Sequence, residues 1–277
     1  MKNNLVGKSV HRVRRFSPGL ALTIVAMLAQ NHAGAIPVAP ALGLAGTFGV
    51  LGASAVTVAG PTTINGDLGS YPTPAITING AVTVNGVNQR ADAAAAAAHA
   101  DLLTGFAQAA AAPVTTYLGP AADLSGDTLA GGVYNGSSSL AVTGTLTLDA
   151  DGNPNEVWIF QAGSTLLMTA ASQIVLTGGA QASNVYWEVG SSATIGADTT
   201  FEGDILAYAS ITLGAGATVD CLVAAETGAI TMANNIITSP DDLVVPSVPD
   251  GGNTMLMLGS GFLALAFVSR KVMSPAK

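Results

Sequence analysis

Residues 185–213 read VYWEVGSSATIGADTTFEGDILAYASITL and contain one complete unit of the repeat that decides the fold. A Thr–apolar pair stands at Thr194-Ile195 and returns at Thr212-Leu213. Between the pairs lie two more short strand-like stretches, bounded by Gly and Asp residues that are typical of turns. Three short strands within a period of about 18 residues fit one coil of a β-solenoid. The stretch therefore predicts a mostly β protein with three faces.

The same pair occurs at Thr165-Leu166 and at Thr231-Met232. The interval from Thr212 to Thr231 nearly repeats the first one, whereas the interval before Thr194 is longer, and we assign its extra length to a corner loop at residues 178–181. Because side chains alternate along a strand, we expect the apolar members to point inward and the four threonines to form an outward file. Its rungs would lie ~4.8 Å apart. Another strand precedes each pair, and the aromatic side chains of these strands are expected to fill one corner of the core.

One segment, from Asn88 to Ala112, interrupts the strand pattern and predicts a helix over about 88–112, with Asn88 as its N-cap. Leu102, Leu103 and Phe106 would form its apolar stripe. Such a helix is about 36 Å long, enough to flank about seven stacked coils. We expect it to cover one face of the solenoid. The alternative is a linker helix between two β domains.

Charged residues make up only 9% of the 277 residues, against a usual value of about 25%. Between Ile36 and Pro249 there are 16 acidic residues and one basic residue, Arg90, which gives a net charge of −15. A surface of that sign repels phosphate backbones, so nucleic acid is not an expected partner.

The chain offers no arrangement of catalytic residues. His99 is the one histidine after residue 35, and Cys221 is the only cysteine. The segment 149–153, Asp-Ala-Asp-Gly-Asn, lacks the later ligands of a calcium loop and is interpreted as a turn. Cys221 lies among apolar residues and is expected to be buried. We therefore expect no enzymatic activity, no metal and no cofactor.

The first 35 residues predict a secretory signal peptide. A basic start is followed by an apolar stretch from Gly19 to Ala29 and by the small-residue pattern Ala33-Gly34-Ala35, after which signal peptidase would cleave. Export to the cell envelope or beyond is the expected outcome.

Residues 246–277 form a second targeting element. The apolar stretch from Met255 to Val268 is followed at once by basic residues, which is typical of an anchor with its positive end inside. The element resembles PEP-CTERM-type sorting tails, in the Val-Pro-Asp variant, which exosortases process. The matching residues are Val248, Pro249, Asp250, Gly251, Gly252, Arg270 and Lys271. The alternative is a plain C-terminal membrane helix.

The domain between the two ends, residues 36–245, resembles a known family through a series of short blocks. These blocks are residues 48–51, 64–69, 129–134, 146–149, 157–161, 179–194, 227–232 and 237–240. The block at 184–194, NVYWEVGSSAT, is the most specific. In these blocks the chain is similar to the microbial ice-binding (antifreeze) proteins. That family implies a right-handed discontinuous β-solenoid of triangular cross-section with one long helix packed along it.

The resemblance also implies a flat face that adsorbs to ice. Its candidate ice-binding residues here are Thr165, Thr194, Thr212, Thr231, Thr169, Ser172, Thr199, Asn234 and Asn235. Thr57 and Thr77 would extend this face from the N-terminal half. The chain departs from the family pattern where other residues replace hydroxyls: Leu167, Met168, Ala197 and Ala215.

The leading hypothesis is an exported ice-binding protein, expected to be monomeric, with ice as its partner. The alternative is an envelope adhesin or matrix protein that uses the same scaffold to hold exopolysaccharide or other cells. A polysaccharide lyase or hydrolase is a third class, and Arg90 alone cannot supply the charged groove that it needs.

Overall fold

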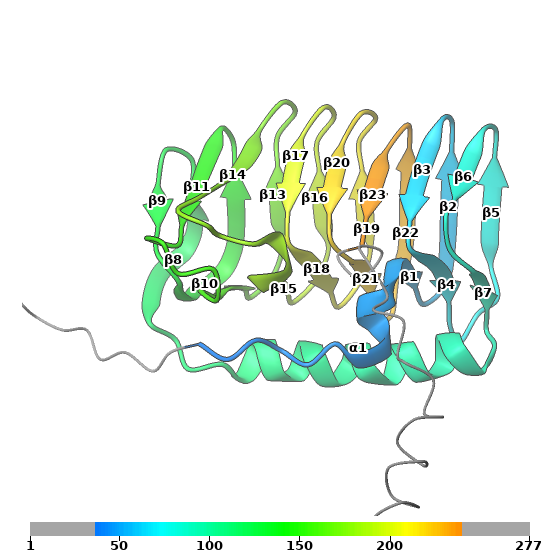
Figure 1. The fold of residues 1–277 in the computed structure, drawn as a ribbon, viewed down its shortest axis with the longest axis horizontal. Coiled ribbons are helices and arrows are strands. Elements are labelled where there is room, and N and C mark those ends of the chain that lie inside the picture. Colours follow the sequence, from blue (N-terminus) through cyan, green and yellow to red (C-terminus); the bar gives the residue numbers. More distant parts are fainter. Residues whose placement is uncertain (1–36, 240–277) are drawn as a thin grey trace, which may run out of the picture. The chain divides into compact units, whose positions relative to one another are not determined.

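A computed structural model describes residues 37–239. The predicted signal peptide and sorting tail lie outside the described residues. Within 37–239 the chain winds through parallel strands that stack into three long faces, as the sequence predicts (Figure 1). No helix in this part of the chain is long and apolar enough to cross a membrane.

We name the faces by what covers them. The helix face contains β7 (Asn88–Arg90), β4 (Asp67–Ser70), β1 (Phe48–Gly52), β21 (Val223–Ala225), β18 (Asp204–Ala207), β15 (Val185–Val189) and β12 (Trp158–Ala162). The threonine face contains β5 (Ile76–Asn79), β2 (Ala55–Ala59), β22 (Ala229–Ala233), β19 (Ile211–Leu213), β16 (Ala193–Ile195) and β13 (Leu166–Met168). The third face contains β6 (Val82–Val84), β3 (Thr62–Asn65), β23 (Ile236–Thr238), β20 (Thr218–Asp220), β17 (Thr200–Glu202), β14 (Gln173–Thr177), β11 (Thr145–Asp149) and β9 (Thr128–Leu129).

One long strand, β10 (Gly132–Val142), joins two of these faces. Its first half pairs with β12 of the helix face and its last three residues pair with β13 of the threonine face. It therefore bends around an edge of the solenoid. Strand β8 (Thr116–Asp123) pairs with the outer side of β10 and ends the stack.

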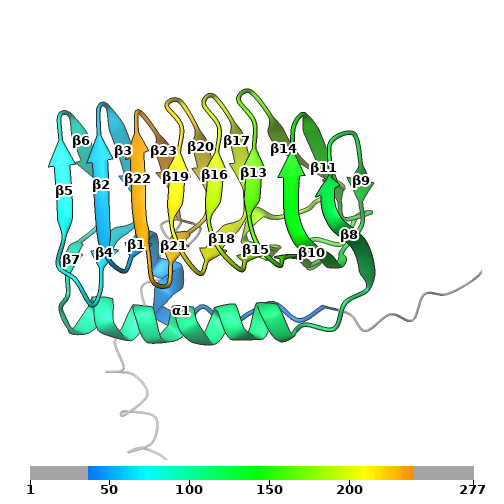
Figure 2. The same ribbon diagram turned by 180° about the vertical axis from the view of Figure 1, so that it is seen from behind.

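The order of the coils along the solenoid differs from their order along the chain. Strands β1 to β7 build one end, helix α1 (Ala93–Ala111) runs back along the stack, and the coils from β8 onward return toward the start (Figure 2). The two parts meet where β1, β2 and β3 pair in parallel with β21, β22 and β23. This confirms the discontinuous solenoid that the resemblance implies.

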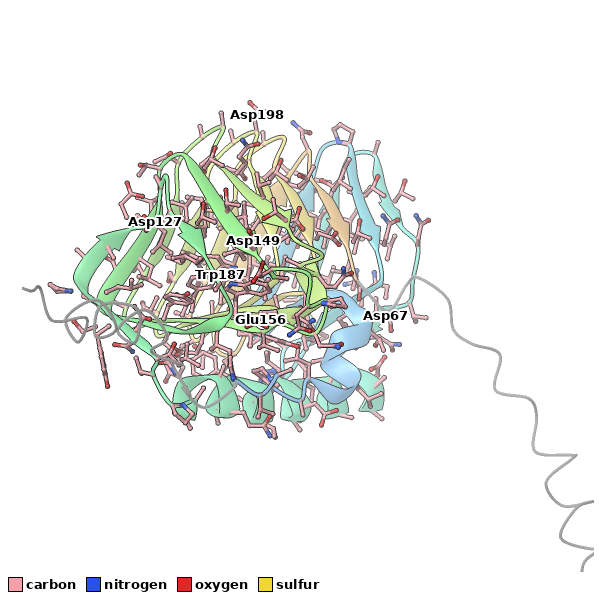
Figure 3. All side chains as sticks on the ribbon, turned by 60° about the vertical axis from the view of Figure 1, so that its left-hand side comes forward. Asp67, Asp127, Asp149, Glu156, Trp187 and Asp198 are labelled. Atoms are coloured by element: carbon pink, nitrogen blue, oxygen red, sulfur yellow. The ribbon has the colours of Figure 1, made fainter. Side chains whose placement is uncertain are left out.

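The inward-facing side chains form the main core. A column of rings runs through it, as the aromatic strands predict. The ring centroids of Tyr134 and Phe160 are 5.4 Å apart, those of Phe160 and Trp187 are 4.0 Å apart, and those of Trp187 and Phe201 are 5.5 Å apart. Trp187 lies inside the coils, whereas the labelled acidic residues lie around the outside (Figure 3).

The helix is shorter than the sequence predicts. Asn88 belongs to β7, and the N-cap is Asp92, whose carboxylate accepts a hydrogen bond from the Ala95 amide at 2.9 Å. Asn88 continues the strand because it pairs with Leu68 of β4. The 19-residue helix is about 28 Å long and covers about six rungs.

The side of the helix that is buried against the solenoid also differs in part from the predicted apolar stripe. Leu102 is fully buried and Phe106 is partly buried, but Leu103 is 45% exposed. Most of the other buried positions are alanines, such as Ala98 and Ala109, which let the helix approach the sheet closely, while Gly105 leaves room for Leu42 in the segment before β1. At the C-terminal end of the helix, the buried Gln161 amide donates to the carbonyls of Ala109 and Ala112 at 2.8 and 3.0 Å.

Replacing Asp92 by Ala is expected to lower the free energy of unfolding by about 1 kcal/mol, because the first turn loses its capping carboxylate. Asp92→Asn, which keeps an acceptor oxygen, should lose much less. Urea denaturation of the three proteins measures both changes. Equal losses in the two variants would show that the charge, and not the cap, carries the effect.

Candidate functional site

Five threonines stand in line on the threonine face. Thr194 pairs with Thr212, Thr212 with Thr231, Thr231 with Thr57, and Thr57 with Thr77. Neighbouring rungs of a parallel sheet lie ~4.8 Å apart, so the file repeats at that spacing over five rungs. The strand pairing confirms the prediction that Thr57 and Thr77 extend the file.

These five hydroxyls are free. Thr194, Thr212, Thr231 and Thr77 are exposed and Thr57 is half-buried, and none of the five hydroxyls hydrogen-bonds to another group within residues 37–239. Their strand neighbours on the inner rungs are buried in the core; in β19, for example, Ile211 is 1% and Leu213 is 3% exposed, whereas Ile78, next to Thr77 on the end rung, is 40% exposed. The file is therefore a rigid row of methyl and hydroxyl groups whose hydrogen-bonding capacity is left to the solvent.

Thr165 does not belong to this file, so its predicted place is wrong. Leu167 pairs with Thr194, and Leu166 pairs with Ala193. Thr165 is exposed, but it lies two residues earlier along its rung. A shift of two residues keeps every side chain on the same side of a strand, so the alternating pattern alone could not distinguish the two registers.

Beyond Thr194 the positions in line with the file are no longer threonines. Leu167 is 44% exposed, and it is followed on the next rungs by Ala141 and Asp123. Thr169, another predicted site residue, is half-buried, and its hydroxyl donates to the Thr143 carbonyl at 3.1 Å. This end of the threonine face therefore has few free hydroxyls.

Three predicted site residues are buried in the turns of the solenoid, where their side chains cannot contact an ice surface. Ser172, Thr199 and Asn235 are each at most 1% exposed, at the turns between the threonine and third faces. The Ser172 hydroxyl donates to the Thr169 carbonyl at 2.7 Å, and the Thr199 hydroxyl to the Gly196 carbonyl at 3.0 Å. The Asn235 amide donates to the Gly214 carbonyl at 2.7 Å. These side chains close the turns and so hold the threonine strands in place.

Asn234, by contrast, is exposed at the same edge. Its φ of 59° lies in the left-handed region, which asparagine tolerates better than most residues. Asp198, with a φ of 56°, takes the same conformation two coils away, at the turn between β16 and β17 (Figure 3). Ala197 precedes Asp198, and Ala215 precedes the left-handed Gly216 in the corresponding turn between β19 and β20. Asn234 therefore borders the threonine face without being part of the file.

The third face has threonines too, but they form a broken row. Thr83 pairs with Thr63 and Thr200 pairs with Thr218, while the exposed Ile236 separates the two pairs. Its neighbouring outward positions include the carboxylates of Glu202 and Asp220. Sequence reasoning did not weigh this face, and its interruptions make it less regular than the threonine face.

Charge is distributed away from the threonine file. Its five rungs carry no ionisable group, and Asp123 stands at the far end of the face. Burial tends to raise the pKa of Asp123, but hydrogen bonds from Ser125 and Thr143 outweigh it and lower that pKa. Elsewhere, burial raises the pKa of Glu188, Glu202 and Glu226 to about 7 each.

The described residues hold no cluster of three His, Cys, Asp or Glu side chains placed to bind a metal. Residues 149–153 form a turn, in which the Asp149 carboxylate accepts from the Asp151 amide at 3.0 Å. His99 is on the buried side of helix α1, beside Tyr71, and Cys221 is buried as predicted. The arrangement can present an ordered surface.

The three raised glutamate pKa values predict that stability falls as the pH rises. An unfolded glutamate titrates near ~4.3, so between about 4.3 and 7 the folded chain holds more protons and the free energy of unfolding decreases with pH. We expect a lower melting temperature at pH ~8 than at pH ~5. The double variant Glu188→Gln, Glu226→Gln should flatten the difference. A melting temperature that rises over this range would contradict the prediction.

Comparisons with known proteins agree with this geometry. The family described as "Ice-binding-like" matches residues 50–238, and the "VPDSG-CTERM motif" matches residues 247–272. The chain is 42% identical over 236 residues to a protein named "Ice-binding protein" from Nostoc sp. (strain HG1), covering 83% of this chain and 86% of that protein.

Solved structures show the same fold. An ice binding protein from an Antarctic Biological Consortium matches with a TM-score of 0.68 and 39% identity, over 73% of this chain and 91% of that one. An ice-binding protein from the Antarctic ascomycete Antarctomyces psychrotrophicus matches with a TM-score of 0.67 and 37% identity, over 73% of this chain and 98% of that one.

Proposed function

The chain belongs to the ice-binding-like family, and on that basis we propose that it is an exported protein that adsorbs to ice through its threonine face. The observation that carries the proposal is the file of five free hydroxyls at Thr194, Thr212, Thr231, Thr57 and Thr77. In this assignment these five replace the wider set of predicted site residues.

The mechanism follows from the chemistry of threonine on a rigid strand. Each methyl group limits the orientations of the water beside it, and each hydroxyl anchors one water by a hydrogen bond. Because the rungs repeat at ~4.8 Å and the core fixes them, the bound waters repeat as well. Such a layer can merge with the lattice at the surface of an ice crystal. The adsorbed protein then stops growth at the points where it sits.

Thermal hysteresis and crystal shape, measured with the purified chain, test this function. Faceted crystals and a measurable hysteresis gap support it. Round crystals, together with a β-sheet circular dichroism spectrum and cooperative unfolding, would mean that the fold is kept without ice binding.

Export is supported by the C-terminal motif match at residues 247–272. We propose that signal peptidase removes residues 1–35 and that an exosortase-type enzyme recognises the tail. The cell surface is then the location to test first. We assign no reaction to the chain.

Leu167→Thr is expected to raise the activity. Leu167 is an exposed apolar side chain at the rung next to Thr194, so threonine there would lengthen the file from five rungs to six without touching the core. Thermal hysteresis at equal protein concentration measures the gain. Thr165→Leu, two residues earlier, just before β13 and outside the file, serves as the matched control and should change little. A Leu167→Thr variant with lower activity would place the ice contact elsewhere.

A further inference from the structure

The two ends of the solenoid differ (Figure 1). At one end the outermost strands of the three faces are β5, β6 and β7, and we name this part, residues 76–90, the open end. At the other end lie β8 and β9, residues 116–129, which we name the closed end. Within residues 37–239 no further strand pairs with the outer edges of these strands. An unpaired edge is a template for another β-strand unless its sequence prevents pairing.

The closed end has the features that prevent pairing. Strand β8 contains Pro120, which has no amide hydrogen to donate, and Gly119 before it takes a φ of 94°. The pairing of β8 with β10 is interrupted by two shifts of register. Asp123 and Asp127 add negative charge. Because prolines, bulges and charges keep strand edges from joining, the closed end is not suited to hold another strand.

The open end lacks these features. Strands β5, β6 and β7 pair with β2, β3 and β4 without a shift of register, and residues 76–90 contain no proline and no acidic residue. The core is also incompletely covered there, because Ile78 is 40% exposed and Val82 and Val84 are only partly buried. The turn before β7 adds Val87, which is 56% exposed. This end therefore offers both free backbone groups and apolar surface to a partner strand.

The charge of the domain limits where two copies of it can meet. With 16 acidic residues and one basic residue between Ile36 and Pro249, two copies repel each other over most of their surfaces. The open end is an exception, because its only charged residue is Arg90. The Arg90 guanidinium group reaches from β7 to β5, where it donates to the Ile76 carbonyl at 2.8 Å. Two open ends can therefore approach each other with little repulsion.

We propose that two copies of the chain join end to end through their open ends. Because the closed end is not suited to pairing, a head-to-tail row of copies does not form, and the contact is a closed, two-fold one. A two-fold contact reverses the strand direction, so β5 pairs antiparallel with β5 of the second copy, and β6 pairs with β7 of that copy. This arrangement keeps the two Arg90 side chains apart, whereas pairing β7 with itself would bring these like charges together.

The alternation of side chains along β5 limits which residues meet. Opposite residues of antiparallel strands point to the same side of the sheet, so the outward Thr77 meets an outward residue, either Thr77 or Asn79 of the second copy. The first choice places each Ile78 opposite an Ile76 and covers it, and we adopt it. The two threonine files then form one surface, with five rungs from each copy. This surface rests on the proposed function, whereas the pairing does not, and the dimer replaces the monomer expected from the sequence.

Analytical ultracentrifugation of the full chain tests the pairing, and we expect the mass of a dimer. Ile78→Lys should give a monomer, because pairing would bury two ammonium groups against apolar side chains, whereas in the monomer each can reach the solvent. The matched control is Leu103→Lys, in the middle of the helix and 45% exposed, which should stay dimeric. A monomeric unmodified chain, or equal association of the two variants, would overturn the proposal.

Disulfide cross-linking tests the register and leaves the core unchanged. Cys221 is buried, so an added surface cysteine reacts alone. Opposite Cα atoms of an antiparallel pair lie about 4.5–5.5 Å apart, within the range of a disulfide. Under oxidation Thr77→Cys should therefore form linked dimers about ten times as fast as Leu103→Cys, or faster, because the pairing holds the two sulfurs at a high effective concentration. Equal rates would contradict the proposed contact.

Neither experiment uses ice, so failure of this proposal and failure of the proposed function are distinguishable. A monomeric chain that shapes ice crystals would overturn the pairing and leave the proposed function intact. A dimer that cross-links at Thr77→Cys, formed by a chain that leaves ice crystals round, would support the pairing and overturn the proposed function.

Discussion

Replacing Thr212 by Tyr is expected to reduce thermal hysteresis about ten-fold or more, because adsorption depends on close complementarity between the two surfaces. Thr212 is exposed on the second rung of the file, between Thr194 and Thr231. A phenol ring there would stand above the neighbouring hydroxyls and separate them from a flat crystal surface. It would not disturb the core, because the side chain points outward between the buried Ile211 and Leu213.

The matched control is Thr200→Tyr on the third face. Thr200 is also an exposed threonine on a short parallel strand with a threonine, Thr218, on the next rung. Crystal shaping, hysteresis and melting temperature are measured for both variants. We expect Thr200→Tyr to keep the activity of the unmodified chain. Loss of activity in the control and retention in Thr212→Tyr would move the site to the third face.

Truncating Trp187 to Ala is expected to cost about 4 kcal/mol of unfolding free energy, the usual cost of removing a large buried aromatic side chain. Trp187 is 1% exposed, and its ring lies against Phe160 and Phe201 in the aromatic column. Its indole nitrogen also donates to the Glu202 carbonyl at 3.1 Å, and the truncated side chain would leave that carbonyl without its partner. Chemical denaturation monitored by circular dichroism measures the loss.

Tyr117→Ala separates the effect of burial from that of ring size. Tyr117 is 79% exposed at the outer strand of the stack, so its removal should change the stability by less than about 0.5 kcal/mol. A loss in Trp187→Ala no larger than that in Tyr117→Ala would mean that the aromatic column does not hold the coils together.

Much of the fold could be predicted from local patterns. Alternation and turn residues identify the strands of each coil, because inward side chains must be apolar for the core to form. The aromatic column was predictable for the same reason, since Phe160 and Trp187 recur at corresponding places in successive coils. The helix was predictable from its alanines. Its start was not, because Asn88 and Asp92 are both suitable caps and the pairing of Asn88 with β4 decides between them.

The candidate site was harder to predict, for two physical reasons. The register between coils depends on the length of each corner loop, and a slip of two residues leaves the alternation unchanged. Leu167 therefore lies beside Thr194, in the position expected for Thr165. Polar residues in the turns, such as Thr199 and Asn235, look like surface residues in a sequence. Only the structure shows that their hydrogen bonds to nearby carbonyls bury them.

The meeting of the N-terminal coils with β21, β22 and β23 has a consequence for the kinetics of folding. An ordinary solenoid can nucleate at any repeat and grow outward by contacts between sequence neighbours. Here the junction in the middle of the stack joins residues about as far apart as the domain allows, as the Ser239–Gly46 hydrogen bond shows across 193 positions. Closing so large a loop costs entropy before any contact at the junction forms. We therefore expect the threonine file to be completed in a late, slow step, after both halves of the stack have formed.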